Sequence, residues 1–203
     1  MAKKTTRSSS TSPVTSDADA PLTVPGLDTT TGHAVADALQ MRVHALNDLQ
    51  LTLKHAHWNV VGPHFIGVHE MLDPQIDGVR AMVDALAERM STLGVPPNGL
   101  PGALVAARTW DDYDLHRADT TAHLAALDLV YTGVIEDHRA AIDAVGDDPV
   151  TEDMLTGQTG ELEQYQWFVR AHLQGTSGAL SSAGAEDEVG AARKATRRTP
   201  RKR

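Results

Sequence analysis

Five polar side chains spaced along an otherwise apolar, helical stretch constrain this chain more than any other feature of its sequence. All five are residue types that bind first-row divalent metals, and they are His57, His69, Asp73, Asp84 and Glu88. From the second to the last, the intervals are 4, 11 and 4 residues, which fall near whole turns of a helix with about 3.6 residues per turn. The last four side chains are therefore expected on one stripe of a single helix.

This stripe is too long for one metal ion. At about 1.5 Å per residue, His69 and Glu88 lie roughly 28 Å apart along the helix axis, whereas a metal ion holds its ligands at about 2 Å. Two copies of the helix running antiparallel across a two-fold axis would place His69 of one subunit opposite Glu88 of the partner subunit. The spacing therefore predicts metal sites between subunits, with two equivalent sites in each dimer.

The composition excludes several other classes of protein. The 203 residues include no cysteine, which removes disulfides, thiolate metal ligands and cysteine nucleophiles. Hydrophobic residues make up 41%, and no apolar run approaches the ~18 residues that a membrane span needs. No apolar segment follows the charged N-terminus as it would in a secretory signal. We therefore expect a cytoplasmic protein with no membrane partner.

Charge is distributed unevenly along the chain, whose net charge is −9. Residues 8–190 carry 8 basic and 27 acidic side chains, a net charge of −19, and the two ends carry the other 10 of the 18 lysines and arginines. The ends should therefore attract nucleic acid while the body repels it. The residues expected to bind DNA are Lys3, Lys4, Arg7, Arg193, Lys194, Arg197, Arg198, Arg201, Lys202 and Arg203.

Hydrophobic periodicity predicts four long helices and gives no signal for a strand. The predicted helices cover 31–61, 66–93, 120–145 and 151–173. Thr31 is expected to cap the first of them, and a short extra helix is expected at 109–116, in the connection between the second and the third. Four helices of this length are typical of an all-α four-helix bundle.

The helix ranges also define the predicted domain organisation. The bundle is expected over 31–175, between a flexible N-terminal tail over 1–30 and a flexible, basic C-terminal tail over 176–203, because neither tail has an apolar period. Within the second helix, Pro74 removes one backbone donor and can kink the helix, which makes the reach of Asp73 the least defined of the five. Gly78 either lets two helices approach at the two-fold axis or is an accident of composition.

The stretch from Lys54 to Met90, KHAHWNVVGPHFIGVHEMLDPQIDGVRAMVDALAERM, resembles the Dps family. Members of that family are the miniferritins, or DNA-binding proteins from starved cells. The AHWN and VHEMLD blocks, followed by D-x-x-x-E ending in AER, carry the resemblance, which extends over about 25–175 and includes WFVRAHL late in the fourth helix. The order and spacing of these blocks make the resemblance specific.

The resemblance implies a ferritin-like four-helix bundle and a ferroxidase. In this family twelve subunits form a hollow shell, Fe²⁺ is oxidised at sites on dimer interfaces, and ferric mineral is stored inside. His57 and His69 would come from one subunit, and Asp84 and Glu88 from its two-fold partner. Iron would be both substrate and product, and the resemblance implies no organic cofactor.

Two further residues match positions of the family's site. Asp73 matches an acidic ligand that assists the second iron, and Trp58 matches a tryptophan beside the site. Imidazole and carboxylate suit Fe²⁺, Mn²⁺ or Zn²⁺, and the resemblance implies that two neighbouring irons give peroxide two electrons, so that no hydroxyl radical forms. An ordinary ferritin site, with Glu-x-x-His ligands inside one bundle, is disfavoured because the chain contains no E-x-x-H.

Other polar residues have less specific interpretations. His55 and His64 are interpreted as exposed or hydrogen-bonded residues rather than ligands. Acidic pores at three-fold axes guide iron inward in this family, and some acidic residues of the third helix and its ends are expected to line them: Asp119, Asp128, Glu136, Asp137, Asp143, Asp147 and Asp148.

Basic tails of this kind often bind DNA in the family. Each Lys or Arg that binds a phosphate releases counterions, so the logarithm of the binding constant falls with the logarithm of the salt concentration, with a slope of about −0.9 per contact. Because no base-reading element is present, binding should be independent of the DNA sequence. We therefore expect a nucleoid-associated protein that protects double-stranded DNA during starvation and oxidative stress. The alternative is a structural, nucleoid-compacting protein whose metal sites hold Zn²⁺ without turnover.

Overall fold

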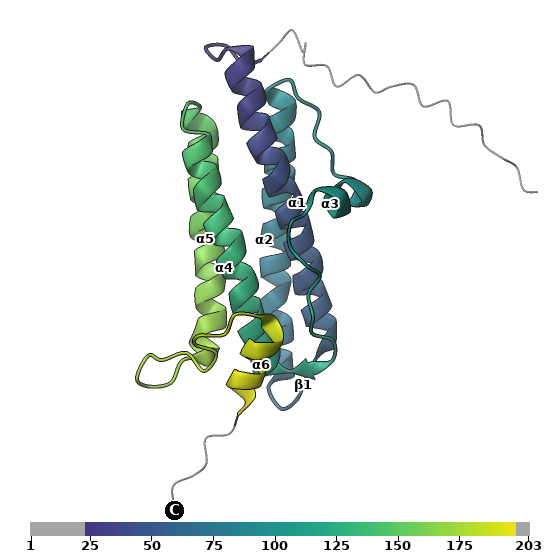
Figure 1. The fold of residues 1–203 in the computed structure, drawn as a ribbon, viewed down its shortest axis with the longest axis vertical. Coiled ribbons are helices and arrows are strands. Elements are labelled where there is room, and N and C mark those ends of the chain that lie inside the picture. The colour runs from purple at the N-terminus through teal and green to yellow at the C-terminus, as the bar shows by residue number, and fades with distance from the viewer. Residues whose placement is uncertain (1–22, 198–203) are drawn as a thin grey trace, which may run out of the picture.

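The computed structural model describes residues 23–197, which are predominantly helical. Four long helices form a bundle (Figure 1): α1 is Thr29–Asn59, α2 is Phe65–Thr92, α4 is Thr120–Ala144 and α5 is Pro149–Leu173. The smaller elements of the described part are α3 (Pro101–Ala107), α6 (Glu188–Thr196), β1 (Val60–Val61) and β2 (Ala118–Asp119). The predicted all-α four-helix bundle is confirmed. None of the helices in the described part is both long and apolar enough to span a membrane.

Helices α1 and α4 begin at residues whose side chains cap them. Asp28 accepts the Thr31 N–H at 2.9 Å at the start of α1, and Asp119 accepts the Ala122 N–H at 2.9 Å at the start of α4. Each bond satisfies one of the first-turn amides that have no acceptor inside the helix. The predicted cap at Thr31 was wrong, because Thr31 supplies the donor and Asp28, three residues earlier, is the cap.

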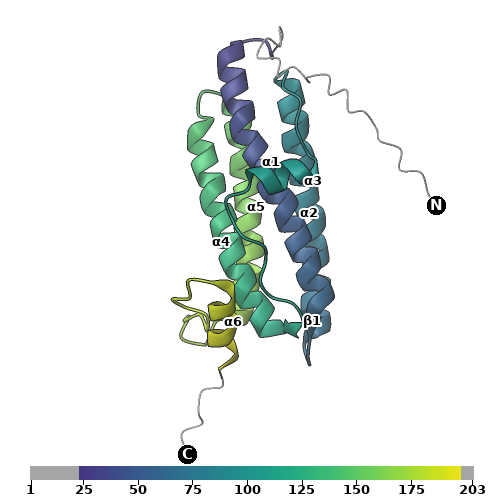
Figure 2. The same cartoon turned by 45° about the vertical axis from the view of Figure 1, so that its right-hand side comes forward.

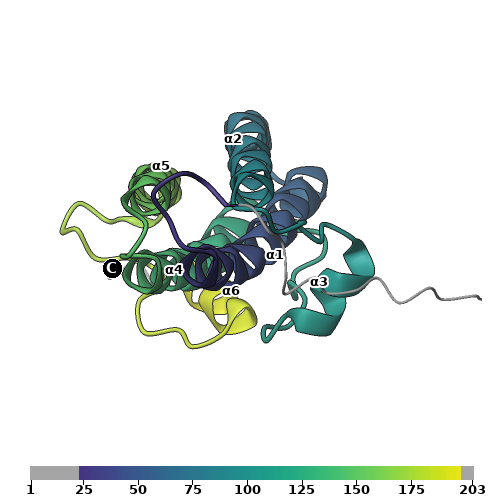
Figure 3. The ribbon, with the colours of Figure 1, turned by 90° about the horizontal axis from the view of Figure 1, so that it is seen from above.

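The hydrophobic core lies between two helical hairpins, α1 with α2 and α4 with α5 (Figures 1 and 2). Seen from above, the two hairpins lie side by side, and α6 lies beside α4 (Figure 3). Full burial of one leucine contributes about 1.5–3 kcal/mol, and the core is dominated by leucines that are essentially inaccessible to solvent: Leu39, Leu46, Leu49, Leu53, Leu72, Leu86, Leu127, Leu155 and Leu162. The apolar stripes predicted from the sequence are therefore the surfaces that hold the bundle together.

Helix α2 runs through Pro74 without interruption, and the proline side chain is exposed. Gly78 of this helix faces α5 of the same chain. A Cβ atom at Gly78 would lie 2.1 Å from the Tyr165 hydroxyl oxygen and 2.9 Å from a carboxylate oxygen of Glu161. The glycine therefore permits close packing of α2 against α5, a role that neither interpretation from the sequence had included.

The connection between α2 and α4 contains the expected extra helix, but not at 109–116. Helix α3 lies earlier and has a proline at its start, where the missing N–H is tolerated. The predicted segment is instead non-helical and held by side chains: Trp110 donates Nε1–H to Asp48 at 2.7 Å, and the Tyr113 hydroxyl lies 3.0 Å from His123 Nδ1. These contacts with α1 and α4 override the local helical pattern.

The segment 176–197 packs against the bundle, which corrects the prediction of a flexible tail from residue 176 onward. Helix α6 lies beside α4 (Figure 2). Asp187 caps it by accepting the Gly190 N–H at 2.6 Å, and Ala191 is fully buried. Most of the side chains that α6 buries are alanines. Because alanine is small and only weakly hydrophobic, the sequence of α6 shows no clear hydrophobic periodicity.

The residues predicted to bind DNA are only partly described. Arg193, Lys194 and Arg197 lie in α6 or directly after it, and all three are exposed. The remainder fall outside the described residues: Lys3, Lys4, Arg7, Arg198, Arg201, Lys202 and Arg203.

Candidate metal centre

The end of α1 and the start of α2 bring His57 and His69 together. His57 lies in the last turn of α1 and is 6% exposed. The turn that follows contains Gly62 with a φ of 111°, a conformation that glycine adopts without a steric penalty. This turn reverses the chain so that the two imidazole rings stack, with centroids 3.5 Å apart and an interplanar angle of 23°.

The two histidines determine each other's tautomer. His57 Nδ1 lies 2.9 Å from the backbone oxygen of His69, and His69 Nδ1 lies 2.9 Å from the backbone oxygen of His57. Because a carbonyl oxygen can only accept a hydrogen bond, both Nδ1 atoms carry the proton. In a neutral ring the lone pair is then on Nε2, which is available to bind a metal ion.

Asp73, one turn after His69, completes a small polar cluster with Lys54. Asp73 Oδ1 lies 3.3 Å from His57 Nδ1 and accepts a hydrogen bond from Lys54 Nζ at 2.8 Å. The hydrogen bond from Lys54 lowers the pKa of Asp73, and burial raises it by a smaller amount. The imidazoles of His57 and His69 also lower this pKa. Lys54 therefore neutralises a carboxylate that the sequence assigned as a metal ligand.

Lys54 is the residue of this cluster that sequence reasoning missed. It lies three residues before His57, so a helical projection places the two side chains on one face of α1. A lysine is not a metal ligand at neutral pH, however, and nothing in the local sequence connects it with Asp73, which is 19 residues away.

Asp84 and Glu88 lie further along α2, on its exposed surface. Their positions put them roughly 22 and 28 Å from His69 along the helix axis. In residues 23–197, no three His, Asp or Glu side chains are grouped so that they could hold a metal ion. The structure thus brings His57, His69 and Asp73 together and leaves the other two predicted ligands apart from them. Trp58, beside His57 in the chain, is 71% exposed.

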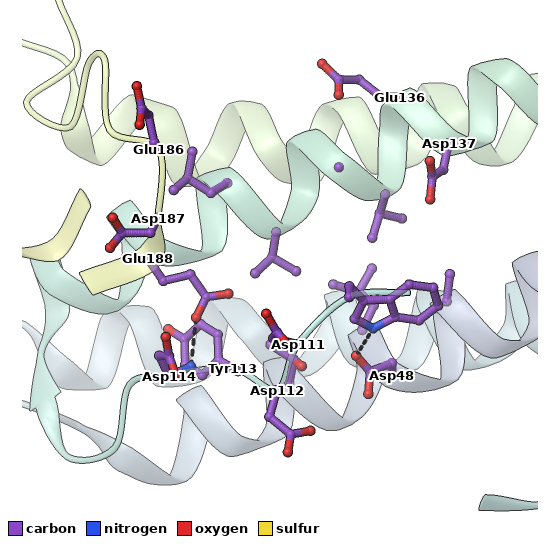
Figure 4. Close-up of a pocket in the computed structure, with 18 residues that line it drawn as sticks. Asp48, Asp111, Asp112, Tyr113, Asp114, Glu136, Asp137, Glu186, Asp187 and Glu188 are labelled. Carbon is purple, nitrogen blue, oxygen red and sulfur yellow. Dashed lines mark hydrogen bonds between the residues drawn. The ribbon is translucent and has the colours of Figure 1, made fainter. Parts of the chain in front are cut away.

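The acidic surface predicted from composition gathers around a different pocket (Figure 4). This pocket has a volume of about 420 Å³, an apolar floor of α1 and α4 side chains, and a rim of carboxylates. Glu188 at the rim accepts the Asp114 N–H at 2.8 Å, and burial raises the pKa of its carboxyl. None of the five predicted metal ligands lines this pocket.

Two of the acidic residues considered for iron-entry pores have structural roles instead. Asp128 is buried and accepts hydrogen bonds from Arg170 at 2.6 Å and from Gln166 at 2.9 Å. Asp148 is buried and accepts hydrogen bonds at 2.5 Å from both Arg89 and Thr151. The carboxylate oxygens of both residues already accept hydrogen bonds from side chains of the same chain. We therefore exclude both residues from the candidate pore residues.

Comparison with known proteins agrees with this fold. Residues 36–179 match the ferritin-like domain family. The DNA protection during starvation protein of Mycolicibacterium smegmatis is 56% identical over 178 residues, which are 87% of this chain and 97% of that protein. The chain belongs to the Dps family. The resemblance seen between Lys54 and Met90 is thereby confirmed.

Two further similarities cover most of this Dps-family chain. The fine tangled pili major subunit of Haemophilus ducreyi is 57% identical over 77% of this chain and 83% of its own length. The solved structure of Mycobacterium smegmatis Dps has a TM-score of 0.80 and 55% identity, covering 81% of this chain and 95% of that structure. The chain is therefore similar to Dps proteins in sequence and in fold.

Proposed function

We propose that this protein is a ferroxidase whose sites are each shared by two subunits. In each site, Nε2 of His57 and of His69 binds Fe²⁺, and Asp84 and Glu88 of the partner subunit supply carboxylate oxygens. Asp73 assists a second iron after Lys54 releases it. Iron is substrate and product, and no organic cofactor takes part.

One observation carries this proposal. The two histidines are locked in the tautomer that leaves Nε2 for a metal, yet the carboxylates expected to share the metal lie exposed at the far end of the same helix. An antiparallel copy of α2 across a two-fold axis removes this separation, because it places the carboxylate end of one helix beside the histidine end of the other. Each dimer then contains two equivalent sites.

The ligand types fit iron oxidation by peroxide. Each Fe²⁺ loses one electron, and peroxide takes up two electrons and two protons to form two molecules of water. Two irons in one site supply both electrons, so a one-electron reduction that releases hydroxyl radical is avoided. Carboxylates favour the product because their negative charge stabilises Fe³⁺, which is stored as mineral in the hollow of a twelve-subunit shell.

Exposed apolar side chains support assembly at this end of the hairpin. Trp58, Phe65 and Ile66 are 71%, 42% and 52% exposed, and they lie close in the chain to His57 and His69. Large apolar side chains that gather on a surface mark interaction sites. We propose that the partner subunit covers them and that Trp58 then packs beside the iron site.

The DNA-binding part of the proposal rests on the basic ends of the chain. Exposed Arg193 and Arg197 at α6 continue into residues 198–203, which contain four further basic side chains. Twelve such ends on one shell bind DNA with high avidity and without sequence preference, through phosphates. The protein then acts in the cytoplasm, on the nucleoid.

Peroxide-dependent oxidation of Fe²⁺ tests this function. The wild-type protein should oxidise Fe²⁺ when peroxide is added, and His57→Ala and Glu88→Ala should each abolish this activity. Normal oxidation by both variants would refute the proposed site. A wild-type protein that binds Zn²⁺ but never turns over iron would instead establish the structural, nucleoid-compacting alternative.

A further inference from the structure

The pocket of Figure 4 is an apolar groove between α1, α4 and the connection that precedes α4. Aliphatic side chains form its floor, and Trp110 and Tyr113 add aromatic surface: the aliphatic residues are Ala45, Leu49, Leu129, Val130 and Val134. Its volume of about 420 Å³ takes long side chains of a ligand rather than a whole folded segment. Trp58, Phe65 and Ile66, which we propose to lie under the partner subunit, do not line it.

The rim of this pocket carries more negative charge than the neighbouring side chains neutralise. Nine of its 18 lining residues are Asp or Glu, and none is Lys or Arg. Between residues 23 and 197, two arginines form ion pairs with these nine carboxylates. Arg42 pairs with Asp137 at 3.2 Å, and Arg108 pairs with Asp112 at 2.5 Å. Arg108 also lies 3.9 Å from Asp48. An apolar floor with surplus carboxylates fits a ligand that has apolar stems and cationic ends.

Glu188 shows the effect of this surplus charge on a single residue. Its side chain is partly buried, and in Figure 4 it extends into the pocket close to Tyr113 and Asp114. Burial raises the pKa of its carboxyl, the hydrogen bond from the Asp114 N–H lowers it, and the charges of Asp114 and Asp187 raise it again. A cationic group beside Glu188 would offset both the burial and the repulsion.

A basic segment of this chain ends within reach of the pocket. Helix α6 begins at Glu188, in the pocket wall, and its 9 residues span roughly 14 Å. The segment 198–203 follows Arg197 and extends to about 20 Å when fully stretched. It is therefore long enough to return along α6 and to place its last side chains at the Glu188 end of the pocket. The segment contains no acidic side chain, and its basic residues are Arg198, Arg201, Lys202 and Arg203.

The basic N-terminal residues 1–7 are a less favourable occupant. Lys202 follows Glu188 by 14 positions, whereas Ala45, the first pocket residue in the chain, follows Arg7 by 38 positions. The entropic cost of closing a loop rises with its length, so the shorter connection gives the C-terminal segment the higher effective concentration at the pocket.

We propose that this pocket docks the basic C-terminal segment 198–203 of the same chain. The apolar stems of the last basic side chains lie on the floor, and their charged ends pair with the rim carboxylates. A docked segment is withheld from DNA, so the acidic body of the protein limits its own DNA binding. This consequence rests on the proposed DNA binding, whereas the docking does not.

Carbodiimide crosslinking of the full chain tests the docking without DNA. The reagent joins an amine to a carboxylate that contacts it, and peptide mass spectrometry locates the new bond. At low salt, Lys202 should crosslink to carboxylates at the α6 end of the rim: Glu186, Asp187 and Glu188. The result would overturn the proposal if Lys202 formed no crosslink to the rim, or if Lys3 or Lys4 formed those crosslinks instead.

Two pairs of substitutions show whether the crosslinks depend on this pocket. The pocket pair is Asp111→Asn with Glu186→Gln. Both carboxylates are exposed, and within residues 23–197 neither takes part in an ion pair or a side-chain hydrogen bond, so the fold should be kept. The control pair, Asp37→Asn with Asp153→Asn, removes two exposed carboxylates elsewhere. The pocket pair should reduce the yield of Lys202 crosslinks several-fold more than the control pair, and an equal reduction would overturn specific docking.

Mixed assemblies of isotopically light and heavy chains identify the chain that supplies the segment. Docking within one chain gives Lys202 crosslinks that are wholly light or wholly heavy. Crosslinks that join a light chain to a heavy one would overturn docking within the same chain and would assign the segment to a neighbouring subunit.

DNA mobility shifts at low salt measure the consequence of docking. In the full chain, the pocket pair should tighten DNA binding about threefold or more relative to the control pair, because docking lowers the fraction of chains that are competent to bind. In chains that end at Arg197, the two pairs should have equal effects. Equal effects in the full chain would overturn the competition with DNA. A wild-type protein that does not bind DNA would refute the proposed DNA binding instead, and the crosslinks would still decide the docking.

Discussion

His57 and His69 each donate Nδ1–H to the other's backbone oxygen, at 2.9 Å in both directions, although they are 12 residues apart. The pair joins the end of α1 to the start of α2 and leaves both Nε2 lone pairs for a ligand. Each imidazole is oriented by the backbone oxygen of the other residue, so the position of each ring depends on the backbone of the other helix. The two histidines therefore act as one unit.

Chains with different defects should restore each other if the iron site is shared. In a mixed dimer of His57→Ala and Glu88→Ala chains, one site lacks both ligands and the other has both. Equal, random mixing makes about half of the dimers mixed, so about a quarter of the wild-type sites should be intact. Fe²⁺ oxidation is measured after the two chains are refolded together, with each variant alone as an inactive control. Failure to recover activity, with mixed dimers verified by native mass spectrometry, would rule out a shared site.

Lys54→Met should tighten metal binding at the candidate centre. The Lys54 ammonium group holds Asp73 Oδ1 at 2.8 Å, and a metal ion that uses Asp73 must displace it. Removal of this competing cation should lower the dissociation constant for a second divalent ion several-fold. The partly exposed ion pair that the metal no longer has to break contributes up to ~1 kcal/mol. Calorimetric titration with Zn²⁺ measures the effect, and Lys54→Arg, which keeps the charge, is the control. Weaker binding by Lys54→Met would show that Lys54 supports the site.

Gly78→Ala should destabilise the bundle. The added Cβ atom would lie 2.1 Å from the Tyr165 hydroxyl oxygen, and overpacking of this kind lowers the free energy of unfolding by about 1–3 kcal/mol. Gly157→Ala in α5 is the matched control because its Cβ meets no atom within 4 Å, and it should stabilise the helix by up to ~1 kcal/mol. Thermal unfolding compares the two, and Tyr165→Phe should partly rescue Gly78→Ala. A raised melting temperature for Gly78→Ala would contradict the packing shown by the structure.

Asp148 should make the fold sensitive to acid. Burial raises the pKa of its carboxyl, but hydrogen bonds from Thr151 and Arg89 outweigh burial and hold the pKa below its usual value of 3.8. A carboxylate with a lowered folded-state pKa contributes stability above its unfolded pKa, and this contribution is lost as the pH falls through the folded pKa.

The variant Asp148→Asn tests this pH dependence. At pH 7 its free energy of unfolding should be lower by about 1–3 kcal/mol, because Arg89 loses a charged partner. Between about pH 4 and pH 2 its stability should fall less steeply than that of the wild type. Urea unfolding across this range measures both effects, with the exposed neighbour change Asp147→Asn as the control. Parallel curves for wild type and Asp148→Asn would show that Asp148 does not contribute to acid sensitivity.

Removal of residues 198–203 should weaken DNA binding without affecting iron oxidation. This truncation keeps α6, whereas a cut at residue 190 would remove Ala191 from the core and expose the surface that α6 covers. The removed segment contains four basic residues, and the salt slope should become shallower by about 0.9 for each of them that binds a phosphate in the full chain. DNA mobility shifts over a range of salt concentrations measure the slope. An unchanged slope would assign DNA binding to other residues.

Several features were predictable because they depend on local pattern. The leucine stripes of the four long helices repeat at the helical period and are buried as expected. The ligand spacing in the second helix already implied that one chain cannot form a complete site, because helix geometry fixes the distance between His69 and Glu88. Both conclusions need only the rise and turn of an α-helix.

Other features depend on contacts between segments that are distant in sequence. The stretch 109–116 has a helical pattern but is held in a non-helical conformation by Trp110 with Asp48 and by Tyr113 with His123. Helix α6 is buried through alanines, which give too weak a hydrophobic signal to be recognised beforehand. In both cases tertiary contacts outweigh local preference.

The sequence by itself determined the helical class and the buried faces, and it predicted a metal site that needs a second subunit, since all three follow from spacing along a regular helix. Only the tertiary structure decided which partners the polar groups have: Lys54 on Asp73, the reciprocal bonds of His57 and His69, and the close contact of Gly78 with Tyr165. The physical reason is that a hydrogen bond or a steric contact depends on distances of a few ångströms between helices, and those distances are set by packing of the whole core.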